Sequence, residues 1–148
     1  MRRGTTRIRV SVRRLRSDGY CVVERARPRT SQSAASLAVN HGGVAIVSAP
    51  GVRLTSVDVR FAPSTFECVA GRVWSNSSSC IVLVVYRPGS SAVTASFYAE
   101  LGEVLDRLST FVDAVVLAGD VNIRLERKSD PQSVEFCEVN EKTHGVGV

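Results

Sequence analysis

An acid and an amide stand two positions apart at Asp120 and Asn122, directly after an apolar run. Side chains two residues apart lie on one side of an extended segment, so these groups share a face. A carboxylate can deprotonate a water or hold a divalent cation, and an amide can hold that water or a phosphate oxygen. The pair therefore suits phosphodiester hydrolysis. An Asx turn in which Asn122 bonds its own backbone explains the same spacing.

A second chemical group stands at the end of another apolar run, where Tyr86 precedes Arg87 and Pro88. A tyrosine at the end of a strand can contact a phosphate through its hydroxyl. It can equally pack its ring and find a structural partner for that hydroxyl. Spacing alone leaves both interpretations open.

The elements that must position these residues begin with short apolar runs rich in β-branched residues, separated by turn signals. Such runs are typical of strands, and we expect them at 19–25, 43–48, 53–60, 66–74 and 80–86. Their short connections predict an antiparallel meander. The run 81–86 is apolar on both faces, so it should be central in its sheet.

The periodicity changes after Pro88. Apolar residues then recur at the spacing of one face of an amphipathic helix, at Phe97, Leu101, Val104, Leu105 and Leu108. A buried strand at 114–118 follows, so strand, helix and strand form a crossover unit with 80–86 and 114–118 as parallel neighbours. Tyr86 and Asp120 then share the edge where open α/β sheets usually bind ligands. A last helix is expected at 131–139, with Asp130 as its N-cap.

Read together, these segments resemble a known family. The order GGVAIV, F-x-x-V-x-G-R-V, IVLVVYRPGS, FYAELGEVLDRL and VVLAGDVNI, spread over 18–138, is similar to the endonuclease/exonuclease/phosphatase domain of non-LTR retrotransposons. The resemblance implies a DNase I-like two-sheet α/β sandwich, Mg²⁺ as cofactor and DNA nicking as activity. It also implies that Asp120 activates the water and can bind the metal, that Asn122 orients the water, and that Tyr86 contacts the scissile phosphate.

The chain also departs from that family. The family has a strand ending in Asn and another carrying a metal-binding Glu upstream, whereas no acid precedes Asp18 here. The late Ser-Asp-His of the family has no counterpart either. Glu67 alternates with apolar neighbours and is expected to decorate an exposed strand face. We therefore expect a domain truncated at both ends, covering 18–139 and followed by a divergent tail at 140–148, with little or no nuclease activity.

The first seventeen residues form a basic arm. Ten of the nineteen Lys and Arg residues lie in the first 29 positions, against two acids. Clustered arginines favour nucleic acid, because neutralising phosphates releases counterions. We expect contacts from Arg7, Arg9, Arg13, Arg14, Arg87 and Arg124, and a non-catalytic nucleic-acid-binding protein is the alternative function. Ile8, Val10 and Val12 alternate with polar residues, which predicts a strand in this arm. A fragment that cannot fold alone is a third possibility.

The remaining composition excludes several classes of protein. Four widely spaced cysteines form no zinc-binding pair. No run approaches the roughly 18 apolar residues of a membrane span, and no signal peptide is evident. The arginine-rich start has the composition of a mitochondrial transit peptide, but its alternation is that of a strand. We expect an intracellular chain without a membrane partner, nuclear where the function of the element is kept.

Overall fold

The structure is a computed structural model that describes residues 12–26 and 42–142. Two sheets and three helices make up the described part of the chain. In chain order they are α1 (Val12–Ser17), β1 (Cys21–Ala26), β2 (Gly43–Ser48), β3 (Leu54–Val57), β4 (Glu67–Ser75), β5 (Ser78–Tyr86), α3 (Ala95–Leu108), β6 (Ala114–Asp120) and α4 (Pro131–Lys142). The expected mixed α/β class with two sheets is therefore confirmed.

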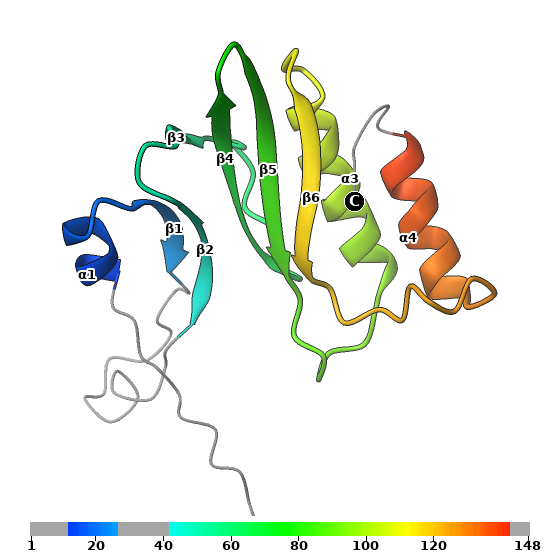
Figure 1. Ribbon diagram of the computed structural model, residues 1–148. Coiled ribbons are helices and arrows are strands. Elements are labelled where there is room, and N and C mark those ends of the chain that lie inside the picture. The colour runs from blue at the N-terminus through cyan, green and yellow to red at the C-terminus, as the bar shows by residue number, and fades with distance from the viewer. Residues whose placement is uncertain (1–11, 27–41, 143–148) are drawn as a thin grey trace, which may run out of the picture.

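The larger sheet has four strands in the order β3-β4-β5-β6 (Figure 1). β3, β4 and β5 are antiparallel, whereas β5 and β6 are parallel. A strand in the centre of a sheet carries apolar residues on both of its faces. β5 has this pattern, and it lies between β4 and β6 as predicted. The crossover through α3 accounts for the parallel pair, so the expected neighbours are confirmed.

The first two strands do not belong to that meander, which corrects one expectation. β1 and β2 pair antiparallel in a sheet of their own, with Cys21 opposite Ser48. After β2 the chain turns at 49–52, where the amide of Val52 donates to the carbonyl of Ala49 at 3.1 Å. The chain then enters the larger sheet at β3, so this turn joins two sheets.

Each face of the larger sheet is covered by a different layer. Every residue of the predicted stripe of α3 is buried, and the stripe packs on the face that carries Ile81, Leu83 and Val85. The opposite face contributes Val69, with Val44 and Ile46 of β2 packed beside it. Figure 1 shows α3 and α4 lying alongside the sheet, with β1 and β2 on the side of β4. The candidate edge is thus supported by a core on both faces.

The basic arm is helical where the structure describes it. Residues Val12–Ser17 form α1, which corrects the expected strand for Val12 and Arg13, while the rest of that stretch lies outside the described residues. The hydroxyl of Ser17 donates to the carbonyl of Arg14 at 2.7 Å, and the amide of Asp18 donates to it at 3.0 Å. These local bonds close a turn that alternation of residue types does not encode.

Two other elements differ in length from their predictions. β3 ends at Val57 because the carboxylate of Asp58 accepts from the amide of Arg60 at 2.9 Å, and Arg60 adopts a positive φ of 54°. α4 runs past 139 to Lys142. Its expected N-cap is confirmed, since the Asp130 carboxylate accepts from the amide of Gln132 at 3.0 Å. In the described ranges, no helix is both long and apolar enough to cross a membrane.

Candidate functional site

Tyr86 and Asp120 are brought together at the carboxyl ends of β5 and β6. They are register partners in the parallel pair, and the amide of Arg87 extends the ladder by donating to the carbonyl of Asp120 at 2.9 Å. Val85 and Leu117 face the helices, whereas Tyr86 packs with the cluster on the opposite face. The two predicted site residues therefore lie side by side on the face away from α3.

A third polar residue lies in the same row. Glu67 is the register partner of Tyr86 across β4 and β5, and paired residues project to the same face of a sheet. Glu67 is partly buried, which corrects the expectation that it lies on an exposed face of its strand. Two strand spacings, about 10 Å, separate its backbone from that of Asp120. Glu67, Tyr86 and Asp120 thus form a row across the sheet.

Glycine makes the close approach of β5 and β6 possible directly before Asp120. Gly119 has a φ of 123°, and a Cβ atom there would come within 2.0 Å of the carbonyl oxygen of Val85. No side chain fits in that space, and L residues rarely adopt such a φ. The carboxylate of Asp120 is therefore placed by a backbone contact that only glycine permits.

Asp120 and Asn122 form an Asx turn. The sequence suggested one in which the side chain of Asn122 bonds its own backbone, whereas in the structure the side chain of Asp120 makes the turn. The carboxylate of Asp120 accepts from the amide N–H of Asn122 at 2.9 Å. Asn122 has a φ of 52°, which asparagine tolerates well. Its own side-chain amide donates to the carbonyl of Arg87 at 2.8 Å. Both side chains therefore order the loop that follows β6, and this fixes their positions at the edge.

Arg87 lies inside the fold, which corrects the expectation of an exposed arginine at nucleic acid. It is 3% exposed. Its guanidinium donates to the carbonyls of Val121 at 2.7 Å, Asn122 at 2.9 Å and Pro88 at 3.3 Å, and also to that of Ser91. A guanidinium has five N–H groups, and carbonyl acceptors can satisfy them without a carboxylate. Arg87 therefore joins the loops after β5 and β6.

The other predicted arginines lie in three places. Arg13 and Arg14 are exposed on α1, where Arg14 lies 3.9 Å from the carboxylate of Asp18. Arg124 is exposed in the segment after β6, two residues beyond Asn122. Arg7 and Arg9 lie outside the described residues. Among the predicted arginines that the structure describes, Arg124 is both exposed and close along the chain to the Tyr86–Asp120 edge.

The residues present do not fit a Mg²⁺ site. In the part of the chain that the structure describes, no group of three or more His, Cys, Asp or Glu side chains could hold a metal. Asp120 already uses one carboxylate oxygen for the Asx turn. Mg²⁺ requires near-octahedral oxygen coordination and usually one or two protein carboxylates. Glu67 lies two strands away from Asp120, so the edge offers two separated carboxylates, an amide and a phenol rather than a metal-binding cage.

Comparison of the chain with family models, with curated proteins and with solved structures gives no match.

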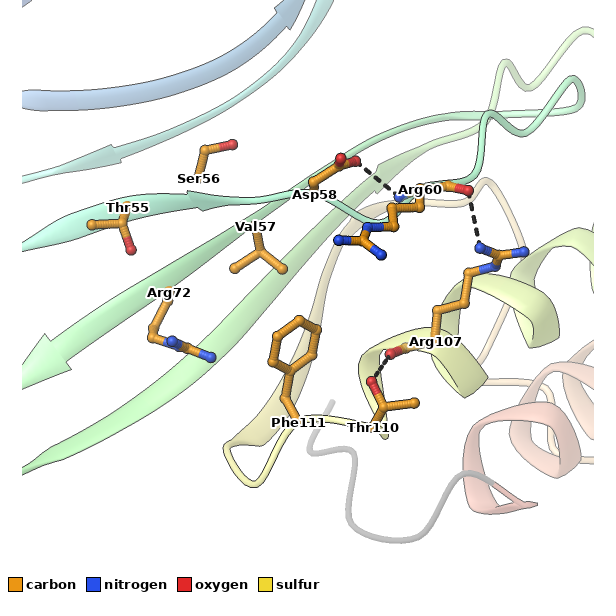
Figure 2. A pocket seen from close by; sticks show the side chains of 9 residues that line it. All are labelled: Thr55, Ser56, Val57, Asp58, Arg60, Arg72, Arg107, Thr110 and Phe111. Carbon is orange, nitrogen blue, oxygen red and sulfur yellow. Dashed lines mark hydrogen bonds between the residues drawn. The ribbon is translucent and has the colours of Figure 1, made fainter.

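Sequence reasoning missed a second polar site, which we name the arginine pocket. Arg60, Arg72, Arg107, Thr110 and Phe111 are among the residues that line it (Figure 2). The three arginines come from the segment after β3, from β4 and from α3. Because their spacing along the chain is irregular, no local pattern signals that they meet.

Proposed function

We propose that this chain is an endonuclease/exonuclease/phosphatase-type domain of non-LTR retrotransposon origin, with a partial DNase I-like sandwich, and that its β5–β6 edge contacts nucleic acid phosphodiesters. The observation that carries this proposal is the register of Tyr86 with Asp120, with Asn122 fixed immediately beyond. The segments that carry the resemblance coincide with β2, β4, β5, α3 and β6. A nuclear location belongs to the same proposal.

The chemistry available at this edge is limited. Asp120 can orient a water through its second carboxylate oxygen, and Tyr86 can donate its hydroxyl to a phosphate oxygen. Asn122 holds the loop through Arg87 and keeps Asp120 in place. A bound metal would supply charge stabilisation worth several kcal/mol in the transition state. Because the described residues do not form its site, we propose that hydrolysis by this chain alone is weak or absent.

Nicking of supercoiled plasmid tests the catalytic part of the proposal. The purified chain and its Asp120→Ala variant are incubated side by side with Mg²⁺ or Mn²⁺, and conversion to open circles is followed. We expect both proteins to nick at the same low rate. Efficient nicking by the parent that disappears in Asp120→Ala would show that the edge forms a working metal-dependent site, against this proposal.

The exposed arginines of α1 favour a second candidate function, nucleic-acid binding without chemistry. Arg13, Arg14 and Arg16 all lie on this helix and are exposed. Binding through phosphate contacts weakens with salt, and each lost contact reduces the salt slope by about one. Replacing Arg13 and Arg14 by Gln should therefore weaken DNA binding and lower that slope. An unchanged slope would count against a role for α1.

A further inference from the structure

β3 forms one edge of the larger sheet, and in the described part of the chain no strand pairs with its outer side. The amide of Trp74 donates to the carbonyl of Arg53 at 3.0 Å, which makes these residues a hydrogen-bonded pair of the antiparallel ladder. Hydrogen-bonded and non-hydrogen-bonded pairs alternate along such a ladder. The backbone N–H and C=O groups of Leu54 and Ser56 therefore point away from β4, toward the place of an additional strand.

The sequence of β3 does not protect this edge. Proteins commonly place Lys, Pro or a bulge on an edge strand so that other chains cannot pair with it. β3 reads Leu-Thr-Ser-Val, and Thr55 and Ser56 are exposed. Its shortness is the one protective feature, and it limits pairing to a short segment.

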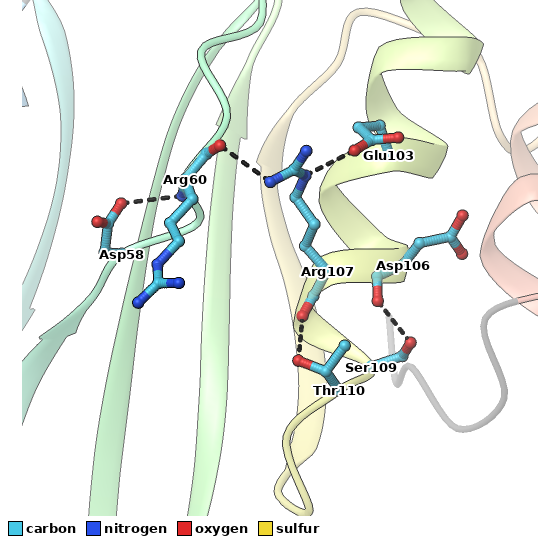
Figure 3. Close-up of polar contacts among 7 residues, drawn as sticks. All are labelled: Asp58, Arg60, Glu103, Asp106, Arg107, Ser109 and Thr110. Atoms are coloured by element: carbon cyan, nitrogen blue, oxygen red, sulfur yellow. Dashed lines mark hydrogen bonds and ion pairs between the residues drawn. The ribbon is translucent and has the colours of Figure 1, made fainter.

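The segment after β3 is held in place from two sides. The carboxylate of Asp58 accepts from the amide of Arg60 at 2.9 Å, and the guanidinium of Arg107 donates to the carbonyl of Arg60 at 3.0 Å. Arg107 is itself held by Glu103 at 2.6 Å (Figure 3). A partner at the edge therefore meets a backbone that is already ordered, which lowers the entropic cost of binding.

An open hollow lies on each side of this edge. The arginine pocket, of about 510 Å³, lies on the face that α3 covers (Figure 2). A second hollow, of about 530 Å³, is bounded by β1, β4 and the segment after β3, and we name it the β1 hollow. Both are lined by Ser56 and Val57. Successive side chains of a strand point to opposite faces, so an added strand would direct its side chains alternately into the two hollows.

The arginine pocket is balanced in charge although three arginines line it. Arg72 lies 2.9 Å from the carboxylate of Asp113, and Arg107 is paired with its neighbour on α3. Asp58 offsets the exposed Arg60, since both line the pocket. A charged group that enters would lose hydration without gaining a free counter-charge. The pocket therefore suits an uncharged side chain.

The β1 hollow is balanced in the same way. Its lining contains two acids, Glu24 and Asp58, and two bases, Arg25 and Arg60. Apolar side chains also contribute to it, among them that of Phe61. An uncharged side chain is again the group that this lining fits best.

We infer that the outer edge of β3 binds a short extended segment of another protein as an additional strand, with uncharged side chains in the arginine pocket and the β1 hollow. Main-chain hydrogen bonds supply affinity in this mode of recognition, and pockets for alternate side chains supply specificity. Ser56 pairs with Gly71, which lies against Ile46 of β2. Register partners share a face, so the residue opposite Ser56 directs its side chain into the β1 hollow. This inference does not depend on nucleic acid at the Tyr86–Asp120 edge.

Selection from a displayed library of random peptides of about ten residues, a length that covers a strand, tests the inference with the full chain as bait. Ser56→Pro removes the outward N–H, and proline is tolerated on an edge strand where that group faces solvent. Ser56→Ala keeps the N–H and is the matched control. We expect enriched peptides with alternating uncharged residues. They should bind the parent and Ser56→Ala equally, and Ser56→Pro roughly tenfold more weakly.

Nuclear magnetic resonance with an enriched synthetic peptide locates the binding. The amide protons of Leu54 and Ser56 should shift downfield and exchange more slowly when the peptide binds. Those of Thr55 and Val57, which point toward β4, should change little. N-methylation of the peptide residue opposite Ser56 removes a donor from the partner instead, so this arm remains decisive where Ser56→Pro lowers thermal stability.

Three results would overturn the inference. The first is a selection that enriches no peptide. The second is equal binding of the enriched peptides to the parent and Ser56→Pro, or equal binding of the methylated and unmethylated forms. The third is a dimer of the chain, detected by sedimentation at rising concentration, that Ser56→Pro abolishes, because a second copy would then cover this edge.

Discussion

Arg87 couples the two segments that carry the candidate site. Its guanidinium donates to four backbone carbonyls, of which two belong to Val121 and Asn122 in the loop after β6. Its guanidinium carbon lies 5.7 Å from the centre of the Phe97 ring, which places the charge against the core. The positions of Asp120 and Asn122 therefore depend on a buried cation that is satisfied by the backbone.

Removal of the Arg87 guanidinium should lower the free energy of unfolding. Arg87→Ala removes a buried side chain and leaves four backbone carbonyls without this donor, and we expect a loss of about 2–4 kcal/mol in the free energy of unfolding. Arg124→Ala is the matched control, because Arg124 is exposed and should change stability by less than about 0.5 kcal/mol. Urea denaturation followed by circular dichroism measures both. Similar values for the two variants would contradict the role assigned to Arg87.

At the scale of elements, Glu100 fastens α3 to the segment that leads into β4. Its carboxylate accepts from the backbone amides of Ser64 and Thr65, the latter at 2.9 Å, and from their hydroxyls at 2.7 Å and 2.6 Å. Burial raises the pKa of Glu100, but the hydrogen bonds from Thr65 and Ser64 outweigh it and lower the pKa to about 2. The charged form therefore stabilises the fold.

The sign of the resulting pH dependence follows from linkage. A carboxyl whose pKa is lower in the folded state than its value of about 4.3 when unfolded stabilises the fold above that value. This stabilisation is lost as the pH falls from about 4 toward 2. Glu100→Gln should lower the free energy of unfolding by about 1–2 kcal/mol at pH 7. It should also make the free energy of unfolding depend less on pH in the acid range. Asp106→Asn, on the exposed side of α3, should leave both unchanged. If the free energy of unfolding of Glu100→Gln and of the parent depended on acid pH in the same way, the stabilising role of the Glu100 carboxylate would be refuted.

The elements also show how far the sequence predicts this structure. The stripe from Phe97 to Leu108 and the apolar run of β5 identify a helix and a central strand, because burial requires those patterns. The crossover rule then brings Tyr86 beside Asp120. Neither pattern separates β1 and β2 from the larger sheet, since a tight turn can equally join strands of one sheet or of two. Alternation in the basic arm likewise does not describe α1, whose hydrogen bonds are local.

The details of the candidate site were less predictable than its location. Asp120 and Asn122 were expected from a local spacing, but the amide of Asn122 bonds Arg87, 35 positions away. Glu67 reaches the row through the register of β4 with β5, and no local signal specifies that register. The arginine pocket combines three separate segments. Such contacts are properties of the tertiary fold.

At the scale of the molecule, the two faces of the larger sheet have different surroundings. α3 and α4 cover one face, and the arginine pocket opens at the C-terminal end of α3. The row of Glu67, Tyr86 and Asp120 lies on the opposite face. We propose that a phosphodiester lies against this row, so a negative charge at Asp120 would oppose binding in the absence of a metal.

Affinity for a short DNA duplex, measured with a chelator present, tests this claim most directly. Asp120→Asn removes one negative charge while keeping an oxygen that can accept from the amide of Asn122. Glu138→Gln is the control, since Glu138 is exposed on α4. We predict that Asp120→Asn binds DNA up to about fivefold more tightly at low salt, as expected for one nearby charge in water, and that Glu138→Gln binds as the parent does. Equal affinity in all three proteins would contradict the placement of a phosphodiester at this edge.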